Sequence, residues 1–163
     1  MLQLKSITLA SAILLTGLSA GLFYAWTVSV IPGTKLVTDK VYLESMQSIN
    51  RAILNPWFFL SFFGALIGLA AASFSQYSAG VDLRFWLVLT AFMVYMLGTF
   101  GVTGLGNVPL NNELEALNLL ELSDIELSEF RTYYEVNWNR LHWIRTGFAI
   151  LSFLMVTVAV LYE

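Results

Sequence analysis

The sequence predicts an all-α fold, an integral membrane four-helix bundle with short amphipathic interfacial helices in the loops between helices one and two and between helices three and four. Its 163 residues are 58% hydrophobic and only 12% charged, whereas soluble domains contain about 25% charged residues. Three runs, 6–34, 52–81 and 85–112, contain no charged residue. Each is longer than the roughly 20 apolar residues that cross a bilayer. We therefore expect residues 1–163 to form a single membrane domain whose main partner is the lipid bilayer.

Several classes of function are excluded by composition. The net charge is −3 and there is no basic run, so nucleic acid is not an expected partner. There is no cysteine and only one histidine, His142. Sites built from thiolates or from several histidines are therefore not available. We expect no cofactor, neither haem nor metal.

The first helix is predicted over residues 6–30, too long for the apolar region of a signal peptide. We expect it to stop at Ile31-Pro32-Gly33, because proline and glycine break helices. Residues 38–54 then carry apolar side chains at spacings of four, three and four, namely Tyr42, Met46, Ile49 and Ile53. This pattern predicts an amphipathic helix at the interface.

The second helix is predicted over 56–75, with Asn55 as its N-cap and Pro56 in its first turn. A short connection leads to the third helix, 84–105, which begins near Leu83. We expect the glycines between 101 and 106 to end it.

The last helical region begins at Ser123, which forms the Ser-x-x-Glu spacing of a capping box with Glu126. An interfacial segment, 123–139, is expected to run on into the fourth membrane helix, 140–162. The uncharged run of this fourth helix covers only residues 146–162. As a helix this run extends about 25 Å, less than the roughly 30 Å of a hydrocarbon core. The helix must therefore draw Arg145 and His142 to the edge of the apolar region or just inside it.

The basic residues predict the orientation in the membrane. Six of them fall on the side of the two interfacial caps, Lys35, Lys40, Arg51, Arg131, Arg140 and Arg145, whereas Lys5 and Arg84 fall on the other side. Cytoplasmic loops are enriched in Lys and Arg. We expect the caps to be cytoplasmic, on the inner membrane if the source is bacterial, and both termini to lie outside.

A candidate site lies at the start of the fourth helix. Glu135, Trp138, His142 and Arg145 follow spacings of three, four and three, so they share one helix face. Ionisable residues inside a membrane are costly, and they are functional candidates for that reason. We interpret Arg140 and Trp143, on another face, as interface anchors.

A second group of polar residues follows helix three, at Asn107, Asn111 and Asn112. An asparagine offers donors and an acceptor and suits the recognition of a carbonyl or phenol, although these residues also fit an ordinary turn. Four further residues are expected near the same depth or flanking the histidine face, as candidate ligand contacts: Tyr24, Trp26, Asn50 and Asn139. Tyr24 and Trp26 fit an aromatic belt equally well.

Four motifs occur in order along the chain: "GLFYAWTVSVIPG", "MQSIN" followed by "NP", "GNVPLNNEL" and "WNRLHWIRT". Together they resemble the anthrone-oxygenase-like family of small four-helix integral membrane proteins. Fungal members of that family are associated with oxidation of anthrones to anthraquinones without an added cofactor. The resemblance implies His142 as a base, Arg145, Asn107 and Asn111 as donors to an oxyanion, and Tyr24, Trp26 and Trp138 as a stacking surface for a flat hydrophobic substrate.

Other functions fit the same residues. A non-enzymatic protein that binds a lipid, a quinone or another apolar ligand needs the same apolar pocket with a few polar groups. A small transporter or assembly partner is a further alternative, with the Glu135, His142 and Arg145 stripe as a proton relay. Helices one to three carry no ionisable residue in their cores, which counts against transport.

Overall fold

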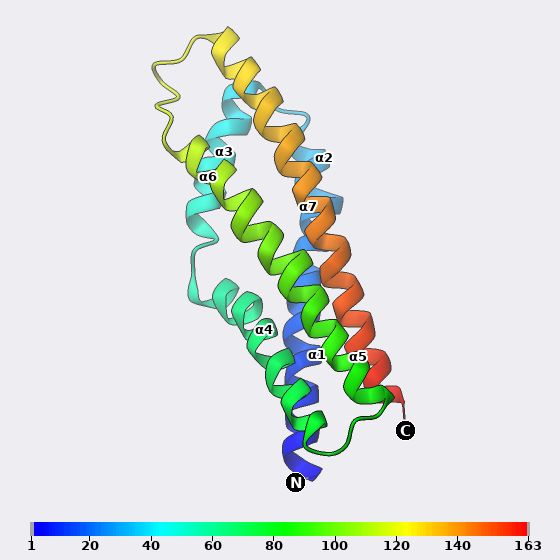
Figure 1. Ribbon diagram of the computed structural model, residues 1–163. Helices are drawn as coiled ribbons and strands as arrows, with labels where there is room; N and C mark the ends of the chain where they lie inside the picture. The colour runs from blue at the N-terminus through cyan, green and yellow to red at the C-terminus, as the bar shows by residue number, and fades with distance from the viewer. Residues whose placement is uncertain (1, 163) are drawn as a thin grey trace.

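The computed structural model describes residues 2–162, which are helical with short connections and contain no strand. Figure 1 shows long helices packed side by side, with both termini at one end and the helical caps at the other. The elements in order are α1 (Leu2–Ala25), η1 (Trp26–Val30), α2 (Ile31–Thr34), α3 (Asp39–Ala52), α4 (Pro56–Tyr77), α5 (Leu83–Val94), η2 (Tyr95–Gly101), η3 (Thr103–Asn107), α6 (Val108–Glu115) and α7 (Asp124–Leu161). The three η elements are π-helical segments within longer helices.

Four continuous helices in the described residues are long and apolar enough to cross a membrane. They run over Leu4–Thr34, Pro56–Tyr77, Leu83–Glu115 and Asp124–Leu161. The predicted all-α bundle with four membrane helices is confirmed, and the chain is an integral membrane protein.

The predicted helix starts are formed as the sequence indicates. The side chain of Asn55 accepts hydrogen bonds from the backbone N–H groups of Trp57 and Phe58 and caps α4. Ser123 and Glu126 form the reciprocal capping box at the start of α7. This helix continues without a break from the interfacial segment into the membrane, as expected.

The predicted end of the first helix is wrong. The chain stays helical through Pro32 and Gly33 as far as Thr34. Pro32 comes directly after η1, where the N–H of Ile31 bonds to the carbonyl of Trp26, five residues earlier. We attribute the continuity to this wider turn, which shifts the carbonyls with which the proline ring would clash in an α-helix.

The predicted end of the third helix is also wrong. Instead of ending at Gly104 to Gly106, it passes through η2 and η3 and continues as α6 to Glu115. The glycines permit close packing here, because a Cβ at Gly98 would lie 2.1 Å from Cγ of Phe148, and one at Gly106 would lie 2.8 Å from Cδ1 of Leu141. A helix without β-carbons at these points can approach α7 closely.

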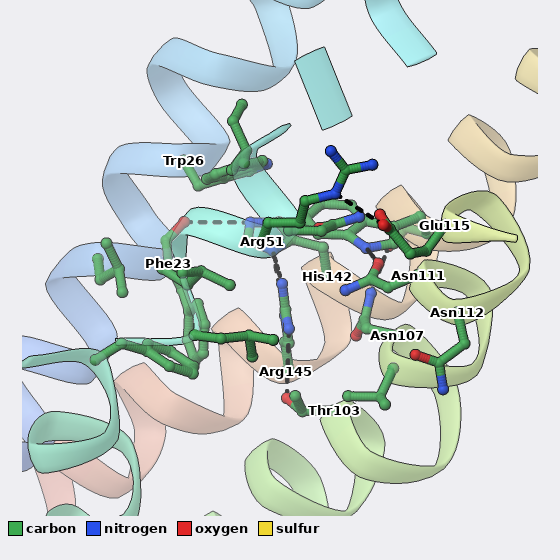
Figure 2. A pocket seen from close by; sticks show the side chains of 18 residues that line it. Phe23, Trp26, Arg51, Thr103, Asn107, Asn111, Asn112, Glu115, His142 and Arg145 are labelled. Atoms are coloured by element: carbon green, nitrogen blue, oxygen red, sulfur yellow. Dashed lines mark hydrogen bonds and ion pairs between the residues drawn. The ribbon is translucent and has the colours of Figure 1, made fainter. Parts of the chain in front are cut away.

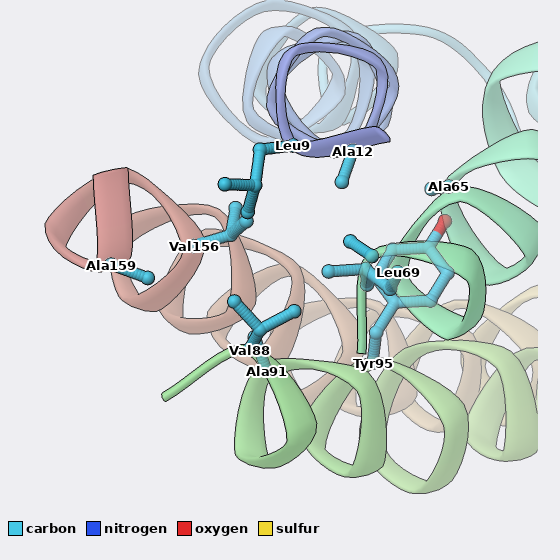
Figure 3. Packing of buried hydrophobic residues seen from close by; sticks show 10 residues of the cluster. Leu9, Ala12, Ala65, Leu69, Val88, Ala91, Tyr95, Val156 and Ala159 are labelled. Carbon is cyan, nitrogen blue, oxygen red and sulfur yellow. The ribbon is translucent and has the colours of Figure 1, made fainter. Parts of the chain in front are cut away.

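The core near the termini consists mainly of small and branched side chains from all four membrane helices. Figure 3 shows these side chains pointing into the space between the helices. The cluster contains Leu9, Ala12, Ala65, Leu69, Ala72, Val88, Ala91, Tyr95, Val156 and Ala159. The Tyr95 hydroxyl lies 2.8 Å from Ser19 Oγ and donates to the carbonyl of Phe62. The side chains of this half of the bundle therefore pack against one another in a single buried cluster.

The cap at the other end is fastened by Arg131 on α7. Its guanidinium pairs with Asp39 and Glu135, each at 3.0 Å, and donates to the carbonyls of Thr34 and Val37. The same guanidinium lies 4.6 Å from the ring centre of Tyr42 on α3. Burial, with Glu135 nearby, raises the pKa of Tyr42 far above its ordinary value, so this phenol is neutral at physiological pH.

Candidate functional site

A cavity of about 390 Å³ lies between the buried core and the cap. Residues from α1 and η1, the end of α3, the start of α4, η3 with α6, and α7 line it. Figure 2 shows that Phe23 and Trp26 reach it from one side, Thr103, Asn107 and Asn111 from another, and His142 and Arg145 from α7. Its wall is mostly apolar, with a few polar groups that converge on one region, as is typical of small-molecule sites.

Three of the four residues predicted to share the α7 face, all except Glu135, are buried at this cavity. Trp138 is 3% exposed, His142 0% and Arg145 7%. The imidazole of His142 stacks on Trp138, with ring centres 5.1 Å apart and planes inclined by 8°. His142 and Arg145 therefore lie inside the bundle, whereas their position at the edge of the apolar region of the membrane stays a prediction.

The hydrogen bonds of His142 determine which ring nitrogen carries the proton. Arg145 approaches Nδ1 with its Nε atom at 3.3 Å and its Nη2 atom at 3.1 Å. A guanidinium can only donate, so Nδ1 accepts and the proton of the neutral ring sits on Nε2. Nε2 faces Thr27 Oγ1 at 3.0 Å and the carbonyl of Phe23 at 3.2 Å, both of which can accept from it.

Arg145 has no carboxylate partner among the described residues, whose ion pairs join Arg51 to Glu115 and Arg131 to Asp39 and Glu135. Besides His142, its guanidinium contacts Thr103 Oγ1 at 3.4 Å and lies over the rings of Phe23 and Trp138, 4.6 and 5.0 Å from their centres. Aromatic faces attract a cation, but they do not neutralise it. The cavity therefore presents a positive charge that a ligand oxygen can reach from an apolar space.

Two asparagines on the third helix add polar atoms with different roles. Asn107 is 1% exposed, and its Nδ2 donates to the carbonyl of Trp138 at 3.2 Å, whereas its Oδ1 has no hydrogen-bond partner in the described structure. Asn111 Oδ1 accepts from Tyr134 Oη and Trp138 Nε1. Only the amide nitrogen of Asn111 therefore remains available as a donor. The atom of Asn107 that lacks a partner is thus an acceptor, whereas the resemblance implies that Asn107 donates to an oxyanion.

The mouth of the cavity lies between α3 and α6. Arg51 Nε donates to Glu115 Oε1 at 2.8 Å, and the two side chains are 61% and 45% exposed. Figure 2 shows this ion pair joining the two helices at the edge of the cavity. Asn50, one residue earlier on α3, donates to Tyr134 Oη.

The structure brings most of the predicted site residues together. Trp26, Asn50, Asn107, Asn111, Trp138, His142 and Arg145 all line the cavity. Tyr24 and Asn139 do not, because each lies one residue beyond a cavity residue and is turned away on its helix. Tyr24 is 56% exposed on the lipid-facing surface. Glu135 pairs with Arg131 instead of His142, and Arg140 and Trp143 are exposed as expected of anchors.

Sequence reasoning missed Phe23, Thr27, Phe58 and Thr103. A signal for Thr103 was present, since Tyr95, Thr99, Thr103, Asn107 and Asn111 recur at a spacing of four across the glycines. Phe23 lies three residues before Trp26 and so shares its helix face. No comparable signal marked Phe58, which reaches the cavity from the start of α4.

No group of three or more His, Cys, Asp or Glu residues in the described structure is arranged to hold a metal ion. The cavity supplies instead one imidazole, the guanidiniums of Arg51 and Arg145, the carboxylate of Glu115, carboxamides and indole rings. These groups can accept a proton, stabilise an oxyanion and stack on a planar ligand.

Comparison with known proteins identifies the family. Neither the curated proteins nor the solved structures contain a significant match. The family model described as anthrone oxygenase matches residues 57–155, more than half of the chain. The matched part contains Thr103, Asn107, Trp138, His142 and Arg145. The chain therefore belongs to the anthrone oxygenase family.

Proposed function

We propose that this protein is a cofactor-independent oxygenase that acts on an anthrone-like aromatic substrate in the membrane. The observation that carries the proposal is Arg145, a buried cation with no carboxylate partner in the described structure, placed beside a neutral imidazole in an aromatic cavity. A charge in such a place suits a substrate that becomes anionic during the reaction.

Anthrone chemistry needs such a charge. Removal of a proton from the methylene carbon gives an enolate, whose negative charge lies largely on oxygen. The electron-rich carbon then reduces dioxygen and forms a carbon–oxygen bond, giving a hydroperoxide. Cleavage of the O–O bond with loss of water leaves the new ketone. One anthrone and one dioxygen thus give one anthraquinone and one water, and dioxygen is the oxidant.

The proposed roles follow from the contacts in the cavity. Nδ1 of His142 is the base, and its Nε2–H stays bonded to Thr27 and the Phe23 carbonyl, which also suit the protonated ring. Arg145 leaves Nδ1 and binds the enolate oxygen, which uncovers the base as the substrate arrives. Trp26 and Trp138, with ring centres 5.5 Å apart, bound the face on which a flat substrate stacks.

The test is turnover of anthrone by the protein purified in detergent, followed by dioxygen uptake and the absorbance of anthraquinone. We expect equal amounts of dioxygen consumed and anthraquinone formed. His142→Ala and Arg145→Ala are expected to lower turnover by roughly a hundredfold or more. Asn137→Ala is the control, because Asn137 is on the same helix as His142 and Arg145 but does not line the cavity. Full turnover by folded His142→Ala and Arg145→Ala would overturn the proposal.

A second candidate is a non-enzymatic protein that binds an anionic apolar ligand, such as a fatty acid. The observation that favours it is that Arg145 blocks His142 from acting as a base, because its guanidinium occupies the only free lone pair of the ring. Tight binding of oleate that depends on Arg145 but not on His142, together with no anthrone turnover by the wild type, would support this candidate.

A further inference from the structure

We infer that Asn107 is a specificity-determining residue that accepts a hydrogen bond from a hydroxyl group of the ligand. The site then selects aromatic substrates that carry a phenolic hydroxyl in addition to the carbonyl that becomes the enolate oxygen. It disfavours the corresponding ethers, whose oxygen can only accept. This inference deepens the proposed function and rests on it for the location of the ligand.

The first step of the argument is the orientation of the Asn107 carboxamide. The backbone carbonyl of Trp138 lies 3.2 Å from its Nδ2. A carbonyl accepts and never donates, so the nitrogen must face it and Oδ1 must face the other way. The atom of Asn107 that has no hydrogen-bond partner is therefore the amide oxygen, which can only accept.

The second step is the shortage of donors around Oδ1. Arg145 Nη1 on α7 is directed to Thr103 Oγ1, which lies one turn before Asn107 on the third membrane helix. The hydroxyl of Thr103 in turn donates to the carbonyl of Thr99. The hydroxyl of Tyr134 and the indole N–H of Trp138 are both taken by Asn111 Oδ1. Within residues 2–162 no group donates to Asn107 Oδ1. A buried acceptor left in this state is costly.

The third step is the contrast between two of the polar groups that line the cavity, Arg145 and Asn107. Arg145 can only donate and takes a ligand oxygen, whereas Asn107 Oδ1 can only accept and takes a ligand hydroxyl. Figure 2 shows Asn107 on η3 and Arg145 on α7, reaching the cavity from different helices.

The experiment measures binding of naphthol and of its methyl ether at neutral pH by quenching of tryptophan fluorescence, corrected for partition into empty micelles. The wild type is expected to bind naphthol roughly tenfold or more tightly than the ether, because only the hydroxyl donates. Asn107→Leu should reduce this preference to less than about twofold. Asn137→Leu is the matched control and should retain it, since Asn137 does not line the cavity and its side chain donates to the carbonyl of Tyr133.

Equal binding of the two probes by the wild type would overturn the inference, and so would an intact preference in Asn107→Leu. If Asn107→Leu fails to fold, the comparison of the two probes on the wild type still decides the matter. Turnover separates this inference from the proposed function. A naphthol preference that depends on Asn107, without oxidation of anthrone, would leave the inference standing and refute only the oxygenase.

Discussion

Arg145 donates from both Nε and Nη2 to Nδ1 of His142, three residues earlier on the same helix. A buried arginine in a membrane protein usually pairs with a carboxylate. Here a neutral ring takes that place, and the positive charge remains uncompensated among the described side chains. The cavity is therefore arranged for a ligand more than for the stability of the empty protein.

Arg145→Leu is expected to be at least as stable as the wild type and to gain about 1 kcal/mol, because an uncompensated buried charge is replaced by an apolar side chain. Ligand binding should be lost. Reversible unfolding in mixed micelles, followed by circular dichroism, measures the free energy of unfolding. A loss of several kcal/mol would show that Arg145 holds the fold together.

Arg131→Leu, on the same helix, is expected to have the opposite effect. Arg131 has two carboxylate partners and two carbonyl partners, and its side chain is only 12% exposed. Its removal leaves those groups unpaired and should cost about 3 kcal/mol in the free energy of unfolding. Arg140→Leu, at an exposed position, is the control and should change the free energy little. Equal effects of the two substitutions would contradict the role of Arg131 in fastening the cap.

Gly98→Ala should destabilise the bundle by about 1–3 kcal/mol, because the new methyl group overlaps the Phe148 ring and forces α7 away. The same unfolding measurement tests it. Gly147→Ala is the matched control, since nothing lies within 4 Å of a Cβ at that position. That substitution should be neutral or stabilising, because alanine favours the helix. Similar losses for both variants would argue against the close approach at Gly98.

Arg51→Ala is expected to speed ligand entry several-fold while changing the free energy of unfolding by less than about 1 kcal/mol, because exposed ion pairs contribute little. The Arg51–Glu115 pair joins α3 to α6 at the mouth of the cavity. Stopped-flow quenching of tryptophan fluorescence by naphthol measures the rate of entry. In the wild type the rate should rise with salt, which screens the pair. A rate independent of both salt and Arg51 would contradict this.

The orientation of the protein can be tested with single cysteines, because the native chain has none. Ala79→Cys is on the connection at the termini end, and Leu120→Cys is on the cap; both positions are exposed. If the caps are cytoplasmic, a membrane-impermeant maleimide labels the first variant in intact cells and the second only after permeabilisation. The reverse pattern would place the termini inside.

Much of the fold can be predicted from the sequence, because a helix that crosses lipid must be long and apolar. Charge-free runs locate the membrane helices, and His142 and Arg145, which the short fourth run predicts at the edge of the apolar region, are buried within the bundle. Helix ends are less legible. Pro32 and the glycines before Asn107 look like breaks, yet Pro32 closely follows a π-helical turn, the glycines lie within two others, and the chain stays helical. Local propensity has no means of showing this, since the wider turns are held by packing against neighbouring helices.

The candidate site can be predicted from the sequence about as far as the fold. The spacing of Trp138, His142 and Arg145 predicts a shared face, and the asparagine cluster predicts a second wall. The i, i+4 spacing of Arg131 and Glu135 indicates their ion pair, but most other partners are set by tertiary contacts. Nothing in the sequence indicates that Asn107 bonds through its nitrogen to the Trp138 carbonyl, or that Arg145 turns to His142.

The π-helical turns put the two ends of the third membrane helix out of phase with each other. Below η2, Phe85 and Val88 face the core, and beyond η3, Leu110 and Leu114 face the cap. Removal of one residue within η2 would rotate everything that follows by about 100°, turning Thr103 and Asn107 away from the cavity while Phe85 and Val88 keep their places. The number of residues in η2 therefore sets the rotation of the cavity-facing half of this helix relative to its core-facing half.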